Sequence, residues 1–213
     1  MPRAAVRTLP PRDEQAAERR RQLVRIASDL IEKGGVDAVT LPRVTAKAGC
    51  ARTLVYRYFA SREALLAGVL DDYFERLDAA IPAVDERTPA AVLAAAGGRA
   101  GADPRALRDI VELLWDVQIA AGFGGAILRA TPHLSPSLRA LVDAAHARHE
   151  RRFTEPLRAA GLSADEARVA LDAMIASFVG LALRARAGAL RKADAIDIHA
   201  RATAGLIRGL LGS

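Results

Sequence analysis

The chain has 213 residues, of which 51% are hydrophobic and 26% are charged, proportions typical of a globular protein rather than a disordered one. Its single cysteine, Cys50, excludes an intramolecular disulfide framework and fits a reducing compartment. The sequence has no uninterrupted apolar run of the roughly 20 residues that a membrane helix needs, and no secretory signal segment. We therefore expect a soluble cytoplasmic protein with no membrane partner.

Positive charge is concentrated in the first third of the chain. Residues 1–62 contain 13 Lys or Arg and 6 Asp or Glu, whereas residues 63–213 contain 18 basic and 19 acidic residues. A basic segment attached to a nearly neutral remainder is typical of a module that binds a polyanion. Charge alone leaves two partners open, namely nucleic acid and an anionic membrane surface.

The first predicted elements are four helices in close succession. A basic arm over residues 1–17 is expected to precede a helix that extends to about Lys33 and ends at Gly34-Gly35. Its apolar residues share one helical face: Leu23, Ile26, Ala27, Leu30 and Ile31. Two short helices follow over residues 41–48 and 51–59, the first capped by Thr40, with a tight turn at Gly49-Cys50 between them. A longer helix is predicted from Ser61 to about Ile81.

The rest of the chain is also predicted to be helical. The expected segments are 89–99, 104–121, 135–160, 164–187 and 193–211, with breaks at Gly97-Gly98, Gly122 to Gly125, Thr131-Pro132, Gly161 and Gly188. No stretch has the alternating pattern of a β-strand. The sequence thus predicts an all-α fold with two domains, residues 18–62 and residues 63–213.

Two short helices joined by a glycine turn inside a basic segment are typical of a helix-turn-helix. The second of them has an apolar face made of Val55, Tyr58 and Phe59. Its opposite face carries Arg52, Thr53, Tyr56 and Arg57. Arginine can bond guanine edges bidentately, and hydroxyl groups can reach bases or phosphates, so this face suits a DNA major groove. Leu54 is placed to contact a thymine methyl group.

The stretch VTLPRVTAKAGCARTLVYRYFASREALL, residues 39–66, resembles the DNA-binding domain of the TetR family of bacterial transcriptional regulators. The resemblance implies that Arg52 and Thr53 read base edges, and that Thr40, Tyr56 and Arg62 contact phosphates. The sequence departs from the family pattern in three places: Thr45 stands where Ala is common, Cys50 replaces a usual Val, and Ala51 replaces the usual Ser or Thr cap. We interpret Cys50 as a small buried hydrophobic residue rather than a redox switch.

The resemblance also implies that the larger domain forms a homodimer through its last two helices and encloses a cavity for a small-molecule effector of unknown identity. Small residues Ala173, Ala176 and Gly180 line one side of the helix over 164–187. The last helix has an apolar stripe of Ile196, Ala200, Thr203, Ile207, Leu210 and Leu211. Each set fits either a dimer interface or the protomer's own core.

Large or polar residues on largely apolar helices are the candidates for the cavity wall. They are Trp115, Gln118, Phe123, His146, Met174 and Phe178. The same residues would equally suit an ordinary core.

Catalytic and metal-binding patterns are weak. His146 and His149 lie three residues apart beside Glu150, but H-A-R-H-E matches no zinc-protease helix and no third ligand is indicated. We expect no enzyme activity, no metal and no cofactor. The sequence predicts a regulator that binds double-stranded DNA at a palindromic operator, most simply a ligand-responsive repressor; the alternative is a DNA-binding regulator that responds to no ligand.

Overall fold

The computed structural model describes residues 12–80 and 105–212, and within these ranges every regular element is a helix. The elements are α1 (Arg12–Gly34), η1 (Val36–Ala38), α2 (Leu41–Ala48), α3 (Arg52–Tyr58), α4 (Arg62–Ala80), α7 (Arg105–Ala130), α8 (Pro136–Ala159), α9 (Ala164–Arg186) and α10 (Lys192–Leu211). The all-α prediction is confirmed. The predicted helix over 89–99 lies outside the described residues.

The first helix begins earlier than its sequence suggested. We expected an arm up to residue 17, but residues 12–17 already belong to α1. Asp13 and Glu14 lie in its first turn, where carboxylates interact favourably with the positive end of the helix dipole. The predicted basic arm is thereby reduced to residues outside the described range.

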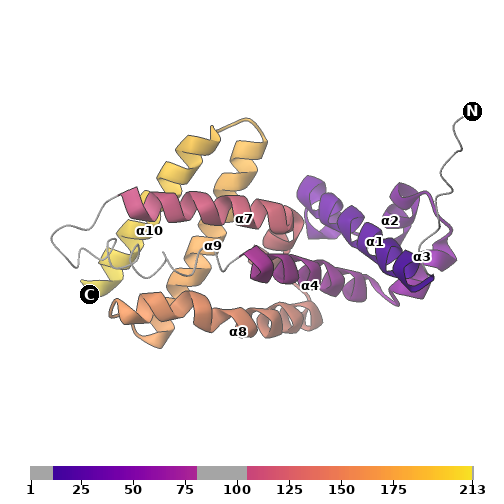
Figure 1. The fold of residues 1–213 in the computed structure, drawn as a ribbon, viewed down its shortest axis with the longest axis horizontal. Helices are drawn as coiled ribbons and strands as arrows, with labels where there is room; N and C mark the ends of the chain where they lie inside the picture. The colour runs from indigo at the N-terminus through magenta and orange to yellow at the C-terminus, as the bar shows by residue number, and fades with distance from the viewer. Residues whose placement is uncertain (1–11, 81–104, 213) are drawn as a thin grey trace, which may run out of the picture.

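Helices α1, α2 and α3 gather at one end of the molecule (Figure 1). The turn between α2 and α3 depends on Gly49, whose φ of 59° lies in the left-handed region that favours glycine. Thr40 caps α2 as predicted, accepting a hydrogen bond from the Arg43 N–H at 3.3 Å. The α3 cap residue Ala51 makes no side-chain cap bond. Buried Val44 and Val55 join the two helices to the core.

Helix α4 connects this end of the chain to the other helices (Figure 1). Gly68, in its first half, faces Phe59 and Val24 of the three-helix unit. Tyr73, in its second half, lies against Gly125 of α7. Helix α4 therefore packs both against the three-helix unit of α1 to α3 and against α7, and its two halves belong to one continuous hydrophobic core.

Helix α7 corrects the predicted break at Gly122 to Gly125. Only Gly122 leaves the helical region, with φ 117° and ψ 100°, and a helix resumes immediately and continues to Ala130. The glycine-rich stretch therefore forms a kink followed by a helix that the sequence analysis missed. Small residues are needed there because α1 and α4 pass within contact distance of the chain, as described below.

One helix in the described part of the chain, Leu107–Ala130 within α7, is long and apolar enough to cross a membrane by length and composition. Half of the relevant window is buried inside the protein. This segment contacts α1, α4, α9 and α10 and turns at Gly122. Its surroundings are those of a core helix.

The last two helices divide their predicted apolar residues differently. The α10 residues Ile196, Ala200, Thr203 and Ile207 are buried in the protomer's own core. On α9, by contrast, Ala173, Ala176 and Gly180 are exposed. Of the two alternatives, the burial of these four α10 residues favours the protomer's own core, while Leu210 and Leu211 at the end of the stripe are half-buried.

Candidate DNA-binding surface and effector cavity

The outer face of α3 carries the side chains that were predicted to meet DNA. Arg52, Thr53, Tyr56 and Arg57 are exposed, and Leu54 is half-buried beside them. Val55 and Phe59 are buried on the opposite face and anchor the helix. The structure therefore brings the predicted residues together on one solvent-facing surface.

Both arginines of α3 rest on tyrosines of the same helix. Arg52 Nη2 donates to the Tyr56 hydroxyl at 3.1 Å, and its guanidinium lies 5.3 Å from the centre of that ring. Arg57 lies over Tyr58 at the same distance. Within the described residues neither arginine forms an ion pair with a carboxylate, so their positive charge is available to a polyanion.

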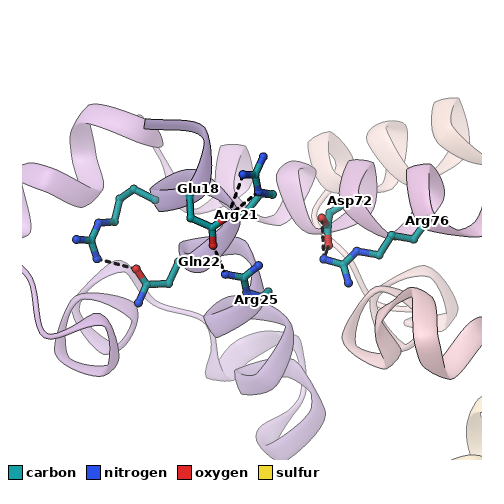
Figure 2. Close-up of polar contacts among 7 residues, drawn as sticks. Glu18, Arg21, Gln22, Arg25, Asp72 and Arg76 are labelled. Atoms are coloured by element: carbon teal, nitrogen blue, oxygen red, sulfur yellow. Dashed lines mark hydrogen bonds and ion pairs between the residues drawn. The ribbon is translucent and has the colours of Figure 1, made fainter. Parts of the chain in front are cut away.

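On helix α1, in contrast, two arginines pair with a carboxylate (Figure 2). Glu18 accepts hydrogen bonds from Arg25 Nη2 at 2.6 Å and from Arg21 Nε at 2.9 Å. The two guanidinium groups, Arg25 more than Arg21, lower the pKa of the Glu18 carboxyl. Figure 2 also shows a pair of Asp72 and Arg76 on α4. Charge is therefore partly neutralised on α1 and α4, in contrast to α3.

Arg62 has a structural role that its sequence position did not reveal. Its Nε donates to the Val39 carbonyl and its Nη2 to the Val36 carbonyl, both at 2.8 Å, with Asp37 Oδ1 at 3.3 Å from Nη2. These bonds join the start of α4 to η1 and to the residue before the Thr40 cap. Among the described contacts, Nη1 makes none.

A cavity of about 80 Å³ lies between α4, α7, α8, α9 and α10. Eleven of its fifteen lining side chains are apolar, as expected for a small-molecule site. Four of the six predicted residues line it: Trp115, Gln118, Met174 and Phe178. Phe123 is buried behind Phe178, with ring centres 6.1 Å apart, and is not among the lining residues. The side chain of His146 lies outside the described residues.

Four polar side chains face the cavity, two from α7 and two from α10. On α7, Gln118 Oε1 accepts a hydrogen bond from the Tyr73 hydroxyl at 3.1 Å, and buried Arg129 lies over the Phe74 ring. On α10, His199 Nδ1 lies 3.0 Å from Ser177 Oγ. Burial lowers the pKa of His199 to about 4, so this imidazole is neutral at pH 7.

The comparisons with known proteins agree on the N-terminal part of the chain. Residues 23–69 match the family model described as bacterial regulatory proteins, tetR family. The sequence-based resemblance is thereby confirmed. A curated relative, the HTH-type transcriptional repressor KstR of Mycolicibacterium smegmatis, is 38% identical over 66 residues, a match that spans 31% of this chain and 32% of that protein's length.

Solved structures extend the likeness to the whole fold. A TetR-family regulator from Agrobacterium tumefaciens has a TM-score of 0.60 at 18% identity, covering 89% of this chain and 97% of that one. The regulator FadR from Bacillus subtilis, solved in complex with stearoyl-CoA, has a TM-score of 0.58 at 16% identity, covering 88% and 96%. At such identities the likeness concerns the fold alone.

Helix α1 meets α7 and α9 at a junction that the sequence did not reveal. At Gly124, an added Cβ would lie 2.4 Å from the Ser28 carbonyl oxygen of α1. The Gly124 N–H donates to Glu32 Oε1 at 3.3 Å, and Arg186 Nη2 of α9 donates to Glu32 Oε2 at 2.5 Å. The glycines of α7 were a signal for close helix approach, but their partners are far away in the sequence: Ser28 and Glu32 for Gly124, and Tyr73 for Gly125.

Proposed function

We propose that this protein is a sequence-specific DNA-binding transcriptional regulator that works in the cytoplasm as a ligand-responsive homodimeric repressor. The observation that carries the proposal is the exposed face of α3, whose two arginines have tyrosine neighbours instead of carboxylates. Arginine in this setting suits the guanine edges and phosphates of a major groove. The tetR-family match of residues 23–69 supports the same function.

In the proposed complex each residue of the DNA-facing surface has one role. Arg52 and Thr53 read base edges, Leu54 contacts a thymine methyl group, and Arg57 extends the basic face. Tyr56 bonds a phosphate.

Two further phosphate contacts lie at the ends of the same surface. The Thr40 hydroxyl accepts from the Arg43 N–H, which leaves its own proton to donate to a phosphate. Arg62 offers Nη1 to another phosphate while Nε and Nη2 hold η1. Its effect on DNA affinity thus combines a direct contact with the placement of Thr40.

A dimer would present two such surfaces to a palindromic operator, with half-sites about 34–36 Å apart. We place its interface on the outer faces of the last two helices. The members of this surface are exposed and either small or apolar: Val169, Ala173, Ala176, Gly180 and Leu183 of α9, and Ile198, Ala202 and Gly205 of α10. Small residues at helical spacing allow close approach of a second copy, and a two-fold axis makes such a surface self-complementary.

Ligand control would pass through α4 and the Gly124 junction, since both connect the cavity-lining helices to α1. Leu77 of α4 lines the cavity, and Tyr73 of the same helix lies against Gly125. A ligand that binds one arrangement of these helices more tightly raises the population of that arrangement, and with it the spacing of the two α3 helices that this arrangement imposes. The size of the shift is limited by the difference in the ligand's affinity for the two arrangements. The structure of Bacillus subtilis FadR in complex with stearoyl-CoA supports effector binding by this fold.

The first test is selection of binding sites from random duplex DNA at several salt concentrations. We expect an enriched inverted repeat, and for Arg52→Ala a loss of about 1–3 kcal/mol with relaxed preference at one base pair. Arg158→Ala, an exposed arginine on α8, is the matched control and should leave affinity unchanged. Uniform, steeply salt-dependent binding without an enriched motif would contradict specific recognition. An enriched motif with no effector response would favour the ligand-independent alternative.

A further inference from the structure

The polar end of the cavity is built around a buried cation. Arg129, near the end of α7, is 6% exposed and is one of the residues that line the cavity. The groups that act on it include Tyr73, the Phe74 ring and Asp172. Burial lowers the pKa of Arg129, while Tyr73 and Asp172 act in the opposite direction. A negative charge placed in the cavity would stabilise this cation further.

The neighbouring amide is oriented to assist. Because Gln118 Oε1 accepts the Tyr73 hydroxyl proton, its Nε2 donors are the part of the amide left to bind something else. Tyr73 also lies close enough to Arg129 for each of the two groups to shift the pKa of the other. Arginine and an amide NH2 are both donors, and together they match a group that only accepts, such as a carboxylate.

The other polar side chains of the cavity carry no competing charge. His199 is neutral at pH 7 for the reason given above, and Thr203 is uncharged. Thr203 Oγ1 is buried without a hydrogen-bond partner in the described part of the chain. Native proteins leave few such atoms unsatisfied.

We propose that the effector is an amphipathic acid, a mainly apolar molecule whose single carboxylate binds Arg129 and Gln118 while its hydrocarbon body fills the cavity. The proposal rests on the proposed ligand-responsive function and adds to it the chemical class of the ligand. The eleven apolar lining side chains accept the hydrocarbon body, and among the lining residues Arg129 is the one with a formal charge at neutral pH.

The test compares three probes with one eight-carbon chain and different head groups: octanoate, octan-1-ol and octylamine, titrated calorimetrically into the full-length protein at pH 7. A charge-assisted hydrogen bond corresponds to about tenfold to a hundredfold in affinity, so octanoate should bind at least about tenfold more tightly than octan-1-ol. Octylamine, protonated at this pH, should bind most weakly.

Variants then assign the preference to one residue. Arg129→Met should weaken octanoate about tenfold or more and leave octan-1-ol within about twofold. Arg129→Lys retains the positive charge and should keep a preference for octanoate over octan-1-ol. This variant replaces Arg129→Met in the test if the methionine variant fails to fold. The control Arg76→Met removes an exposed arginine of α4 that pairs with Asp72, and should change neither affinity.

Each outcome separates this proposal from the function it rests on. Equal binding of octanoate and octan-1-ol, or an unchanged preference for octanoate in Arg129→Met, overturns the proposed carboxylate recognition and leaves an apolar effector site. Binding of none of the three probes by protein that still binds its selected DNA also overturns it, while DNA recognition stands. If the protein binds octanoate but selects no specific DNA sequence, the proposed regulatory function is contradicted and the carboxylate site is supported.

Discussion

Gly124→Ala tests the junction between α1 and the helices around the cavity. The added Cβ would lie 2.4 Å from the Ser28 carbonyl oxygen and 2.7 Å from its Cα, whereas ordinary contacts begin at 3.4 Å. Since part of this obstacle is backbone, α1 and α7 must separate by about 1 Å, roughly the shortfall in distance. Overpacking of this kind costs about 1–3 kcal/mol.

Two further terms modify that cost. Alanine gains about 1 kcal/mol over glycine in a helix, and separation of the helices weakens the Gly124 N–H bond to Glu32, worth about 1 kcal/mol. These terms nearly cancel, so we expect a net loss of about 1–3 kcal/mol. For a chain of this size that lowers the Tm by about 3–10 °C, which scanning calorimetry would measure.

The matched control is Gly205→Ala on α10, where an added Cβ meets nothing within 4 Å. There the helix propensity acts alone, and stability should rise by about 0.5–1 kcal/mol. Because Gly205 lies on the proposed dimer surface, both variants are melted at several protein concentrations, which separates dimerisation from folding. If Gly124→Ala raises the Tm as much as the control does, the close contact of α1 with α7 is refuted.

Three other substitutions make independent predictions. Thr203→Val should stabilise the protein in urea titrations, because its hydroxyl is buried without a described partner. The control Thr154→Val loses the hydrogen bond to the Glu150 carbonyl and should destabilise the protein. Equal effects of the two substitutions would contradict an unsatisfied hydroxyl at Thr203. His199 is protonated near pH 6.5 in the unfolded state and near pH 4 in the folded state. The free energy of unfolding should therefore decrease as the pH is lowered from about 6.5 to about 4, by about 2 kcal/mol at pH 5. His199→Gln should remove this pH dependence. Arg62→Ala should lower both the Tm and DNA affinity, since it removes two bonds to η1; an unchanged Tm would restrict Arg62 to a DNA contact.

The exposed face of α3 could be predicted because it is built from local geometry. Residues three and four apart share a helical face, so Val55 and Phe59 mark the buried side of α3 and Arg52 and Tyr56 the exposed side without further information. A glycine between two short helices predicts the left-handed turn seen at Gly49. Each of these features depends on residues within one or two helical turns.

The remaining features depend on residues that are distant in sequence. Arg62 bonds carbonyls 23 and 26 residues earlier, and Gly124 reaches Glu32 across 92 residues, so no local pattern announces either contact. The same holds for α10, whose apolar face fits a partner or a protomer core equally well until the positions of α7 and α9 are known.

The sequence by itself determined the helical class of this protein, the caps and turn of its helix-turn-helix and the side chains that α3 exposes, because hydrogen bonds and helical periodicity act over a few residues. Only the tertiary structure decided that Gly122 kinks α7 without ending it, that Arg129 and Thr203 face one cavity, and that the outer face of α10 is small and exposed. Those outcomes follow from how helices pack, which depends on shape and charge brought together from the whole chain.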